Sequence, residues 1–303
     1  MKVVNHTEDD WRNDHPTGNI AFHHILKGDP ESYDNFMYIL GRQDGDFEMP
    51  RHRHNFDQIR LPIKGDMNLG QGFILGEGQV GYFAEGMPYG PQSDPLGAAK
   101  PGERIQLVLQ FGGASGYGFM SIEQRRQAWQ ELSQVGKFVG PHFHHKDGRV
   151  EWGLNAVWRH VFGETLKYPR SRYRYPVIIE PENFNWLPVA GTTGLEHKYL
   201  GAFSERGAWI EFLRLKADSV WTSSDEQARR LFVVLSGKGQ AAGRAVNYLT
   251  AIQADPGETL ELSAAEDMEL FLIGMPPIDK PLVESEAFDL EEMPGDDART
   301  AAA

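Results

Sequence analysis

The segment from Pro50 to Gly65 constrains this chain more than any other, because its spacing implies both a strand and a site. His52 and His54 are two residues apart, so on a β-strand both imidazoles point to the same face, and Gln58 has the same parity. Imidazole is a common metal ligand, so two convergent rings indicate a metal site. The alternative is that both histidines are ordinary solvent-facing residues, interleaved as they are with arginines.

Glycine-rich turns and short strand-like runs follow this segment. Gln58 stands four residues after His54 and Gly65 follows seven residues later, while Gly45 lies one residue too far upstream for a perfect match. This pattern resembles the first motif of the cupin superfamily: Gly, five residues, His-x-His, three or four residues, Glu, six residues, Gly. The stretch from Gly78 to Tyr89 is similar to the second motif, with alanine in the proline position and Tyr89 in the histidine position.

The resemblance implies that His52, His54 and Gln58 ligate a divalent metal ion, with Tyr89 in the place of the fourth ligand. A glutamine carbonyl supplies no negative charge, so the ion would polarise a bound oxygen more strongly and be held more weakly. Fe(II) is the expected ion, with Zn²⁺, Ni²⁺ or Mn²⁺ as alternatives. Three roles stay open for Tyr89: a metal-bound phenolate, a general acid or base, and a packed ring with one hydroxyl hydrogen bond.

Strand alternation names further candidates. If Gln58 points inward, so does Arg60, whose guanidinium is suited to clamp a carboxylate or enolate beside the metal. The alternative is that the strand bulges and Arg60 pairs at the surface. The same alternation makes Tyr38 and Gln110 candidates for the substrate pocket.

Composition limits the class of protein. At 303 residues the chain is long enough for two domains, and 40% hydrophobic residues indicate a globular fold. A net charge of −13 argues against nucleic-acid binding, although Arg170, Arg172 and Arg174 alternate with tyrosines, as on a strand with one basic and one aromatic face. Cysteine is absent, which excludes disulfides and thiolate chemistry.

No apolar run is long enough to span a bilayer, and residues 1–30 lack a signal-peptide core. We therefore expect a cytoplasmic protein whose partner is a small-molecule substrate, with no nucleic-acid or membrane partner. It could form a homodimer.

The order of elements indicates a mainly all-β protein of two cupin-type jelly-roll barrels with a connecting helix. The first barrel, residues 1–137, contains strand-like runs at 19–26, 36–41, 56–63, 80–83 and 105–111. A helix follows, with a capping box at Ser121 and Gln124 and an end at Gly136, and we interpret it as a connector. Its expected apolar stripe is Ile122, Trp129, Leu132 and Val135.

The second barrel, residues 189–282, contains strand-like runs at 208–215, 230–235 and 268–273. Ser224, Glu226 and Arg230 stand where its metal ligands would be, so it is expected to be degenerate and to stabilise the first barrel.

Two segments lie outside the barrels. The bridging segment, residues 138–188, holds a second histidine cluster, in which His142, His144 and His145 are followed by a turn and by no carboxylate at ligand spacing. A polar loop or lid is the preferred interpretation, and one of these histidines could close over the first site. Residues 283–303 are acidic and then alanine-rich, and are expected to be mobile.

Cupin enzymes catalyse several kinds of reaction, so the fold does not select one. The first expectation is an Fe(II) dioxygenase acting on a small oxygenated or aromatic molecule, in which Tyr89 and Arg60 orient the reactants. One alternative is a non-redox metal-dependent lyase, isomerase or cyclase in which Tyr89 moves a proton. Another is a bicupin that binds a small molecule without turning it over.

Overall fold

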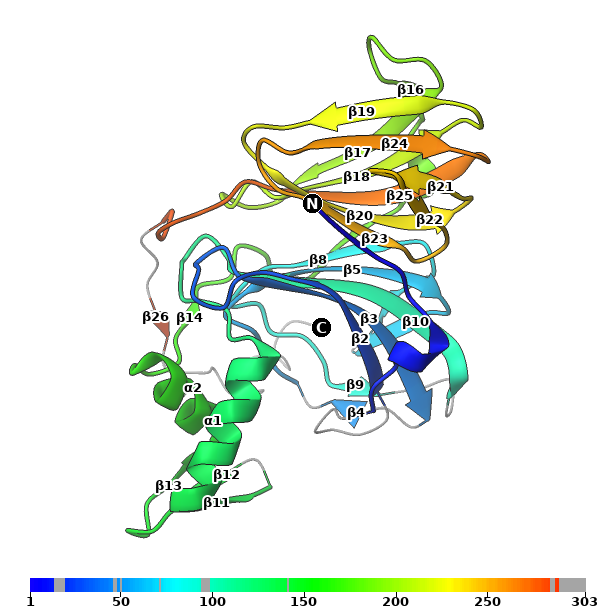
Figure 1. Ribbon diagram of the computed structural model, residues 1–303. Coiled ribbons are helices and arrows are strands. Elements are labelled where there is room, and N and C mark those ends of the chain that lie inside the picture. The colour runs from blue at the N-terminus through cyan, green and yellow to red at the C-terminus, as the bar shows by residue number, and fades with distance from the viewer. Residues whose placement is uncertain are drawn as a thin grey trace.

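The computed structural model describes residues 1–13, 20–45, 48–49, 51–70, 72–93, 99–140, 142–283 and 287–288. They form two β-barrels stacked on each other, with a pair of helices beside the first (Figure 1). The expected all-β fold class with a connecting helix is therefore confirmed. Pro50, Pro141 and nearly all of the acidic segment 283–303 lie outside the described residues.

A six-stranded antiparallel sheet forms one side of the first barrel, in the order β15-β8-β5-β10-β3-β2. Its strands are β2 (Ile20–Lys27), β3 (Phe36–Gly45), β5 (Asp57–Lys64), β8 (Val80–Phe83), β10 (Ala99–Phe111) and β15 (Val177–Ile179). The strand-like runs expected in residues 1–137 are all present. On the opposite side, the described residues form two small pairs, β6 (Met67–Gly70) with β7 (Phe73–Leu75) and β4 (Glu48–Met49) with β9 (Gln92–Ser93).

The second barrel has two substantial sheets. The seven-stranded sheet contains β1 (Lys2–Val4), β23 (Ala251–Ala254), β20 (Arg229–Ser236), β25 (Met268–Met275), β18 (Trp209–Leu215), β17 (Leu195–Ala202) and β16 (Leu187–Pro188). The four-stranded sheet contains β19 (Val220–Ser224), β24 (Thr259–Ala264), β21 (Gly239–Ala241) and β22 (Arg244–Val246). Apolar side chains such as Phe232, Leu262 and Leu270 fill the space between these sheets.

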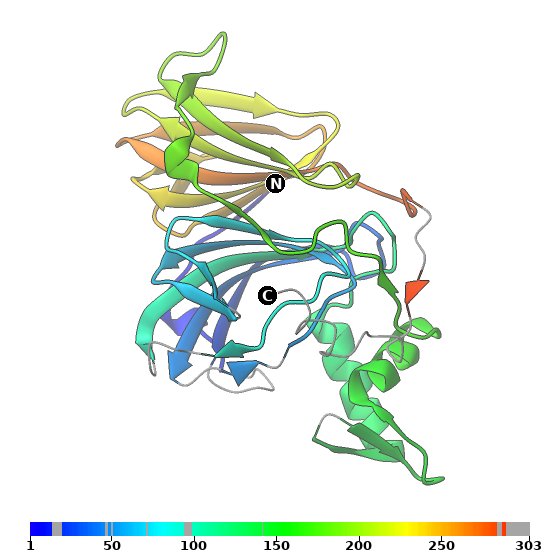
Figure 2. The ribbon, with the colours of Figure 1, turned by 180° about the vertical axis from the view of Figure 1, so that it is seen from behind.

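Two strands cross between the barrels. β1 begins the chain but pairs with β23 of the second barrel, and β15 follows the helices but pairs with β8 of the first (Figure 2). Residues 170–175, whose alternation is typical of a strand, form none. Arg172 instead donates a 2.8 Å hydrogen bond to the buried carboxylate of Glu85.

The helical segment contains α1 (Ile122–Val135) and α2 (Gly153–Phe162), which pack on a small sheet of β11 (Gly136–Val139), β12 (His142–His145) and β13 (Val150–Trp152). Ser121 caps α1 as expected, because its hydroxyl accepts from the Gln124 amide at 3.1 Å. The expected stripe is partly wrong. Ala128 and Leu132 are the buried residues of α1, whereas Trp129 is 42% exposed and stacks on Phe138.

Short elements complete the chain: the 3₁₀ helices Glu8–Asp10 (η1) and Pro181–Asn183 (η2), and the pair β14 (Tyr168–Pro169) with β26 (Ala287–Phe288). Within the described part of the chain, no helix combines the length and the apolar character needed to cross a membrane.

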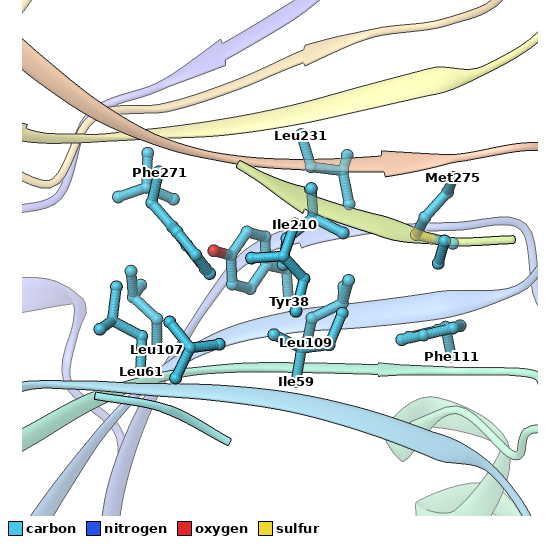
Figure 3. Close-up of a cluster of buried hydrophobic side chains, with 14 of the residues drawn as sticks. Tyr38, Ile59, Leu61, Leu107, Leu109, Phe111, Ile210, Leu231, Phe271 and Met275 are labelled. Atoms are coloured by element: carbon cyan, nitrogen blue, oxygen red, sulfur yellow. The ribbon is translucent and has the colours of Figure 1, made fainter. Parts of the chain in front are cut away.

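The largest apolar core lies between the two barrels (Figure 3). Tyr38, Ile59 and Leu109 are paired across β3, β5 and β10 and share one face of the first sheet, where they meet Ile210 and Phe271 of the second. Because side chains alternate along a strand, the residues next to them face the other way, into the first barrel. This alternation decides which side chains reach the site.

Candidate functional site

A cavity of about 400 Å³ lies inside the first barrel. Its volume falls in the range of small-molecule sites. The six-stranded sheet lines one side with Met37, Ile39 and Val108, and the helices contribute Ile122 and Trp158. The helix α1, expected to be only a connector, therefore takes part in the site. The second barrel is filled by its own apolar core instead.

Backbone pairing brings the two motifs together. His52 and Tyr89 exchange hydrogen bonds, from His52 N to Tyr89 O at 3.0 Å and from Tyr89 N to His52 O at 2.9 Å, and Gly86 N donates to His54 O at 2.7 Å. The histidines are not on a regular strand, because β5 begins only at Asp57. The structure nevertheless places both rings beside Tyr89, with ring centres 4.4 Å away for His52 and 5.9 Å for His54.

Arg60 joins this cluster through Gln58 and Tyr89, two of the positions that the motif resemblance assigns to metal ligands. Its guanidinium donates to Oε1 of Gln58 from Nε at 3.2 Å and from Nη2 at 2.9 Å, and to the Tyr89 hydroxyl from Nη2 at 2.7 Å. Gln58 Nε2 is 3.3 Å from the same hydroxyl, and His54 Nε2 is 3.0 Å from it. Gln58, Arg60 and Tyr89 are all buried.

These contacts define where the protons are. Since Arg60 and Gln58 donate to the Tyr89 oxygen, the hydroxyl hydrogen is left to point at Nε2 of His54. Burial, followed by the charges of His52 and Arg60, lowers the pKa of His54 well below its ordinary value, so this ring is a neutral acceptor. Burial raises the pKa of Tyr89 against the opposing effect of Arg60, so the phenol keeps its proton. Tyr89 and His54 thus form a prearranged donor and acceptor pair.

The remaining sequence candidates divide between the cavity and the core. Gln110 pairs with Gln58 across the sheet and lines the cavity. Tyr38, which alternation was expected to place in the pocket, lies in the inter-barrel core on the opposite face, because it pairs with Leu109. His142, His144 and His145 do not line the cavity either.

The second histidine cluster is strand β12 rather than a loop or lid. His145 lies 2.6 Å from the carboxylate of Glu151, six residues later on β13, and Phe143 is buried against the helices. These residues form a structural hairpin away from the site.

The charge of the cavity lining is one-sided. It contains Arg42, Arg53, Arg60 and Arg125, and no aspartate or glutamate among the residues that the structure describes. Burial lowers the pKa of Arg53 and of Arg125. Two guanidinium nitrogens of Arg53 are buried without a hydrogen-bond partner, and the group stacks 4.2 Å above the Tyr168 ring. Arg42 faces Glu8 at 3.8 Å, but no described carboxylate pairs with Arg53 or Arg125. Buried cations without a counter-charge cost free energy, so the lining suits a ligand that carries negative charge.

Sequence reasoning did not find Arg53 or Arg125. Strict strand alternation turns Arg53 away from the face that holds His52 and His54, but residues 53–54 are outside regular strands, so Arg53 also reaches the cavity. Arg125 lies in the first turn of a helix that packs beside the barrel, a placement that no local pattern encodes.

A divalent ion does not fit the motif cluster as it is arranged. The carbonyl oxygen of Gln58, its one atom able to ligate a cation, already accepts two hydrogen bonds from Arg60. A fixed positive charge about 4 Å from an ion opposes it by roughly 4 kcal/mol per unit of charge at an intermediate dielectric. Over the described ranges, no carboxylate joins His52 and His54 to complete a ligand set. The arginine supplies the positive charge at this position.

No protein-family model matches the sequence, and no curated protein matches it. Solved structures do match the fold. Oxalate decarboxylase from Bacillus subtilis is 14% identical with a TM-score of 0.52, and the match covers 98% of this chain and 82% of that one. HEPD from Streptomyces albus, solved with 2-hydroxyethylphosphonate and Fe(II) bound, is 13% identical with a TM-score of 0.54, covering 96% and 78%.

A third match, GK1651 from Geobacillus kaustophilus, is 11% identical with a TM-score of 0.53 and covers 92% of this chain and 96% of that one. The decarboxylase and HEPD are cupin-superfamily proteins, so the cupin resemblance fits at the level of the fold. At this identity the likeness extends to the fold alone.

Proposed function

We propose that this protein binds a small organic anion with an apolar body inside the first barrel and transfers a proton on it, as a metal-independent lyase or isomerase. The observation that carries the proposal is Arg60, whose guanidinium hydrogen-bonds Gln58 and Tyr89, two positions that the motif resemblance assigns to metal ligands. The positive charge of the guanidinium attracts a carboxylate, and hydrogen bonds between two charged groups are stronger than those between neutral ones. Arg53 and Arg125 add positive charge to the same cavity.

The apolar residues of the cavity lining indicate the chemical character of the uncharged part of the ligand. Ile39, Val108, Phe119 and Trp158 line the cavity, so an aromatic or branched body is expected next to the charged group. A cavity of about 400 Å³ suits a compact molecule. Since His54 lines the cavity and Tyr89 does not, His54 is the group expected to exchange a proton with the ligand.

In this proposal Tyr89 supports His54. When the ligand takes a proton from the His54 ring, the hydroxyl hydrogen of Tyr89 is already directed at Nε2 and replaces the lost proton. The phenolate that remains is stabilised by the donors of Arg60 and Gln58. After that transfer Nδ1 of His54 carries no hydrogen, so it can accept a proton from another atom of the ligand while Nε2 returns its own proton to the Tyr89 phenolate.

Calorimetric titration of the full-length protein with matched acid and amide pairs, such as phenylacetate and phenylacetamide, tests the ligand class. The acids are expected to bind at least about tenfold more tightly than the amides, because one charged hydrogen bond contributes about 1.5 to 3 kcal/mol. The preference should disappear in Arg60→Met and shrink in Arg53→Met. Arg170→Met, at an exposed position outside the cavity, is the matched control. Equal binding of acids and amides, or of neither, would overturn the proposal.

Proton transfer is tested separately. Enolisable 2-oxo acids with aromatic or branched side chains are incubated with the protein in D₂O, and loss of the C3–H signal is followed by NMR. His54→Gln is expected to slow this exchange by about 100-fold or more while acid binding remains. Absence of catalysed exchange with the wild type would reject the activity.

Metal analysis distinguishes this proposal from the metal-dependent dioxygenase that the motif resemblance implies. Iron near stoichiometry in protein purified without added metal, lost in His52→Ala, would replace the present proposal with that one. We expect no metal that depends on His52.

A further inference from the structure

A second cluster of ligand-type side chains lies outside the cavity, where the N-terminal segment meets strand β2. His6 follows β1, Asp10 ends the 3₁₀ helix η1, and His23 is on β2. The ligand atoms of these three residues all lie within 4.8 Å of one another, and all three side chains are partly buried. This cluster is independent of the cupin motif residues.

The imidazoles of His6 and His23 face each other with their Nδ1 atoms. Nδ1 of His6 and Nδ1 of His23 are 2.9 Å apart, so they cannot both carry a hydrogen. Burial lowers the pKa of both rings, which favours the neutral form that binds metals. Trp11 holds the His6 ring edge-on, with ring centres 5.0 Å apart.

The third group supplies negative charge. Thr7 donates to Oδ2 of Asp10 from its amide at 2.7 Å and from its hydroxyl at 2.9 Å. These bonds lower the pKa of Asp10, keep it ionised and fix its orientation, and both go to the same oxygen. The carboxylate therefore has an oxygen left to face the histidines.

The position of the cluster separates it from the cavity. Phe22 and His24 line the cavity, so His23, between them on β2, points to the opposite face. β1, four residues upstream of Asp10's helix, pairs with β23 in the second barrel, whereas β2 belongs to the sheet of the first. A group bound at this cluster would join the N-terminal segment to the edge of the first barrel.

We propose that His6, Asp10 and His23 bind a divalent transition-metal ion of the Zn²⁺ class. Zn²⁺ takes imidazole nitrogens and a carboxylate oxygen together, and three protein ligands leave one position for water. The ion clamps the N-terminal segment, which is paired with the second barrel, to β2 of the first. Its role is to hold the barrels in register, separate from ligand binding in the cavity.

Equilibrium dialysis of the full-length protein against Zn²⁺ at pH 7.5 tests the site. One ion per chain is expected, with affinity lowered at least about 100-fold in His23→Gln and in His6→Gln. His142→Gln, a histidine on the distant hairpin, is the control and should bind as the wild type. Zinc should also raise the unfolding midpoint of the wild type and leave that of His23→Gln unchanged.

Two results would overturn this site. One is unchanged zinc binding in both His23→Gln and His6→Gln, and the other is the absence of binding to the wild type. Zinc that is lost only in His52→Ala would contradict both this site and the metal-independent cavity. Zinc lost in His23→Gln but kept in His52→Ala supports both. The two proposals therefore fail in distinguishable ways.

Discussion

Arg60 sets the chemistry of the cavity through its charge. Its guanidinium holds the Gln58 carbonyl and the Tyr89 hydroxyl by hydrogen bonds of 2.9 and 2.7 Å, and so keeps the ligand positions of the motif engaged with each other. A cation at this point attracts an anion and repels a metal ion, and one side chain therefore controls which kind of group the site accepts.

Removing the charge of Arg60 should reverse the preference of the cavity for an anion over a metal ion. In Arg60→Met the Gln58 oxygen and His54 lose the adjacent cation, so we expect the variant to gain Zn²⁺ or Ni²⁺ binding while losing affinity for carboxylates at least about tenfold. Dialysis against each metal measures the gain, and the double variant Arg60→Met/His54→Ala should lose it. Metal binding that is the same in Arg60→Met and wild type would show that Arg60 does not exclude the ion.

Asp57 is a buried carboxyl whose ionisation should appear in the stability of the protein. It is fully buried and accepts the Glu85 amide at 2.8 Å, and burial together with the nearby Glu85 charge raises the pKa of Asp57 to about 7. The unfolded chain releases this proton near its ordinary value, so between about pH 4 and 7 the folded state binds more protons. The free energy of unfolding should therefore fall as the pH rises through this window.

Asp57→Asn removes this titrating group, and with it the contribution of Asp57 to the pH dependence of the free energy of unfolding. The variant should gain stability relative to wild type as the pH rises from 4.5 to 7.5, as measured by urea unfolding at several pH values. Asp279→Asn, at an exposed position, is the control and should run parallel to wild type. A parallel course for Asp57→Asn as well would mean that Asp57 is ionised throughout.

At the scale of elements, the turn between β8 and Tyr89 aligns the site. Gly86 has φ of +77°, its amide donates to His54 O, and a Cβ built there would lie 1.9 Å from the carbonyl oxygen of Pro169. The turn therefore contacts the histidine segment at His54 on one side and Pro169, which follows α2 in the chain, on the other. Only glycine satisfies both the backbone conformation and the contact.

Gly86→Ala should lower the free energy of unfolding by about 2 to 4 kcal/mol and weaken acid binding, because relieving the clash moves Tyr89. Gly72→Ala is a matched control, since Gly72 has φ of +80° with nothing within 4 Å of the added Cβ. It should cost only about 1 to 2 kcal/mol and leave binding intact. Equal losses in the two variants would mean that the contact with Pro169 is not important. Urea unfolding and titration with phenylacetate give both quantities.

Local patterns predicted the elements better than their partners. The runs that became β5 and β8 and the Ser121 cap were evident because alternation and capping are encoded within a few residues. Helix α2 was hidden in an aromatic-rich stretch, and β1 was missed because its pairing with β23 spans nearly the whole chain. Pairing between distant segments depends on tertiary packing, which a local window does not contain.

The site shows the same division. The motif spacing named His52, His54, Gln58 and Tyr89, and the structure brings these four together. Strand parity predicts that Arg60 points inward with Gln58. It does not predict that the guanidinium hydrogen-bonds Gln58 and Tyr89, because parity gives the face of a side chain but not how far it reaches. Tyr38 was misplaced because a shift of one residue on a strand exchanges the cavity for the core.

For the whole molecule, the two barrels share their largest apolar core. Phe271 of the second barrel is 1% exposed and belongs to the same cluster as Tyr38, Ile59 and Leu109 of the first (Figure 3). β1 and β15 reinforce this contact: β1 precedes the first barrel in the chain but pairs in the second, and β15 leads into the second barrel but pairs in the first. Neither large sheet could lose its partner without exposing this face to water.

The barrels should therefore unfold as one unit. Phe271→Ala is expected to lower the free energy of unfolding by about 3 to 5 kcal/mol and to reduce amide hydrogen-exchange protection in β3 and β10 as well as in β18 and β25. Leu262→Ala, inside the second barrel alone, is the comparison: it should reduce protection in β3 and β10 to the same extent only if unfolding is global. Protection in β3 and β10 that survives both substitutions would show that the first barrel is stable without the second.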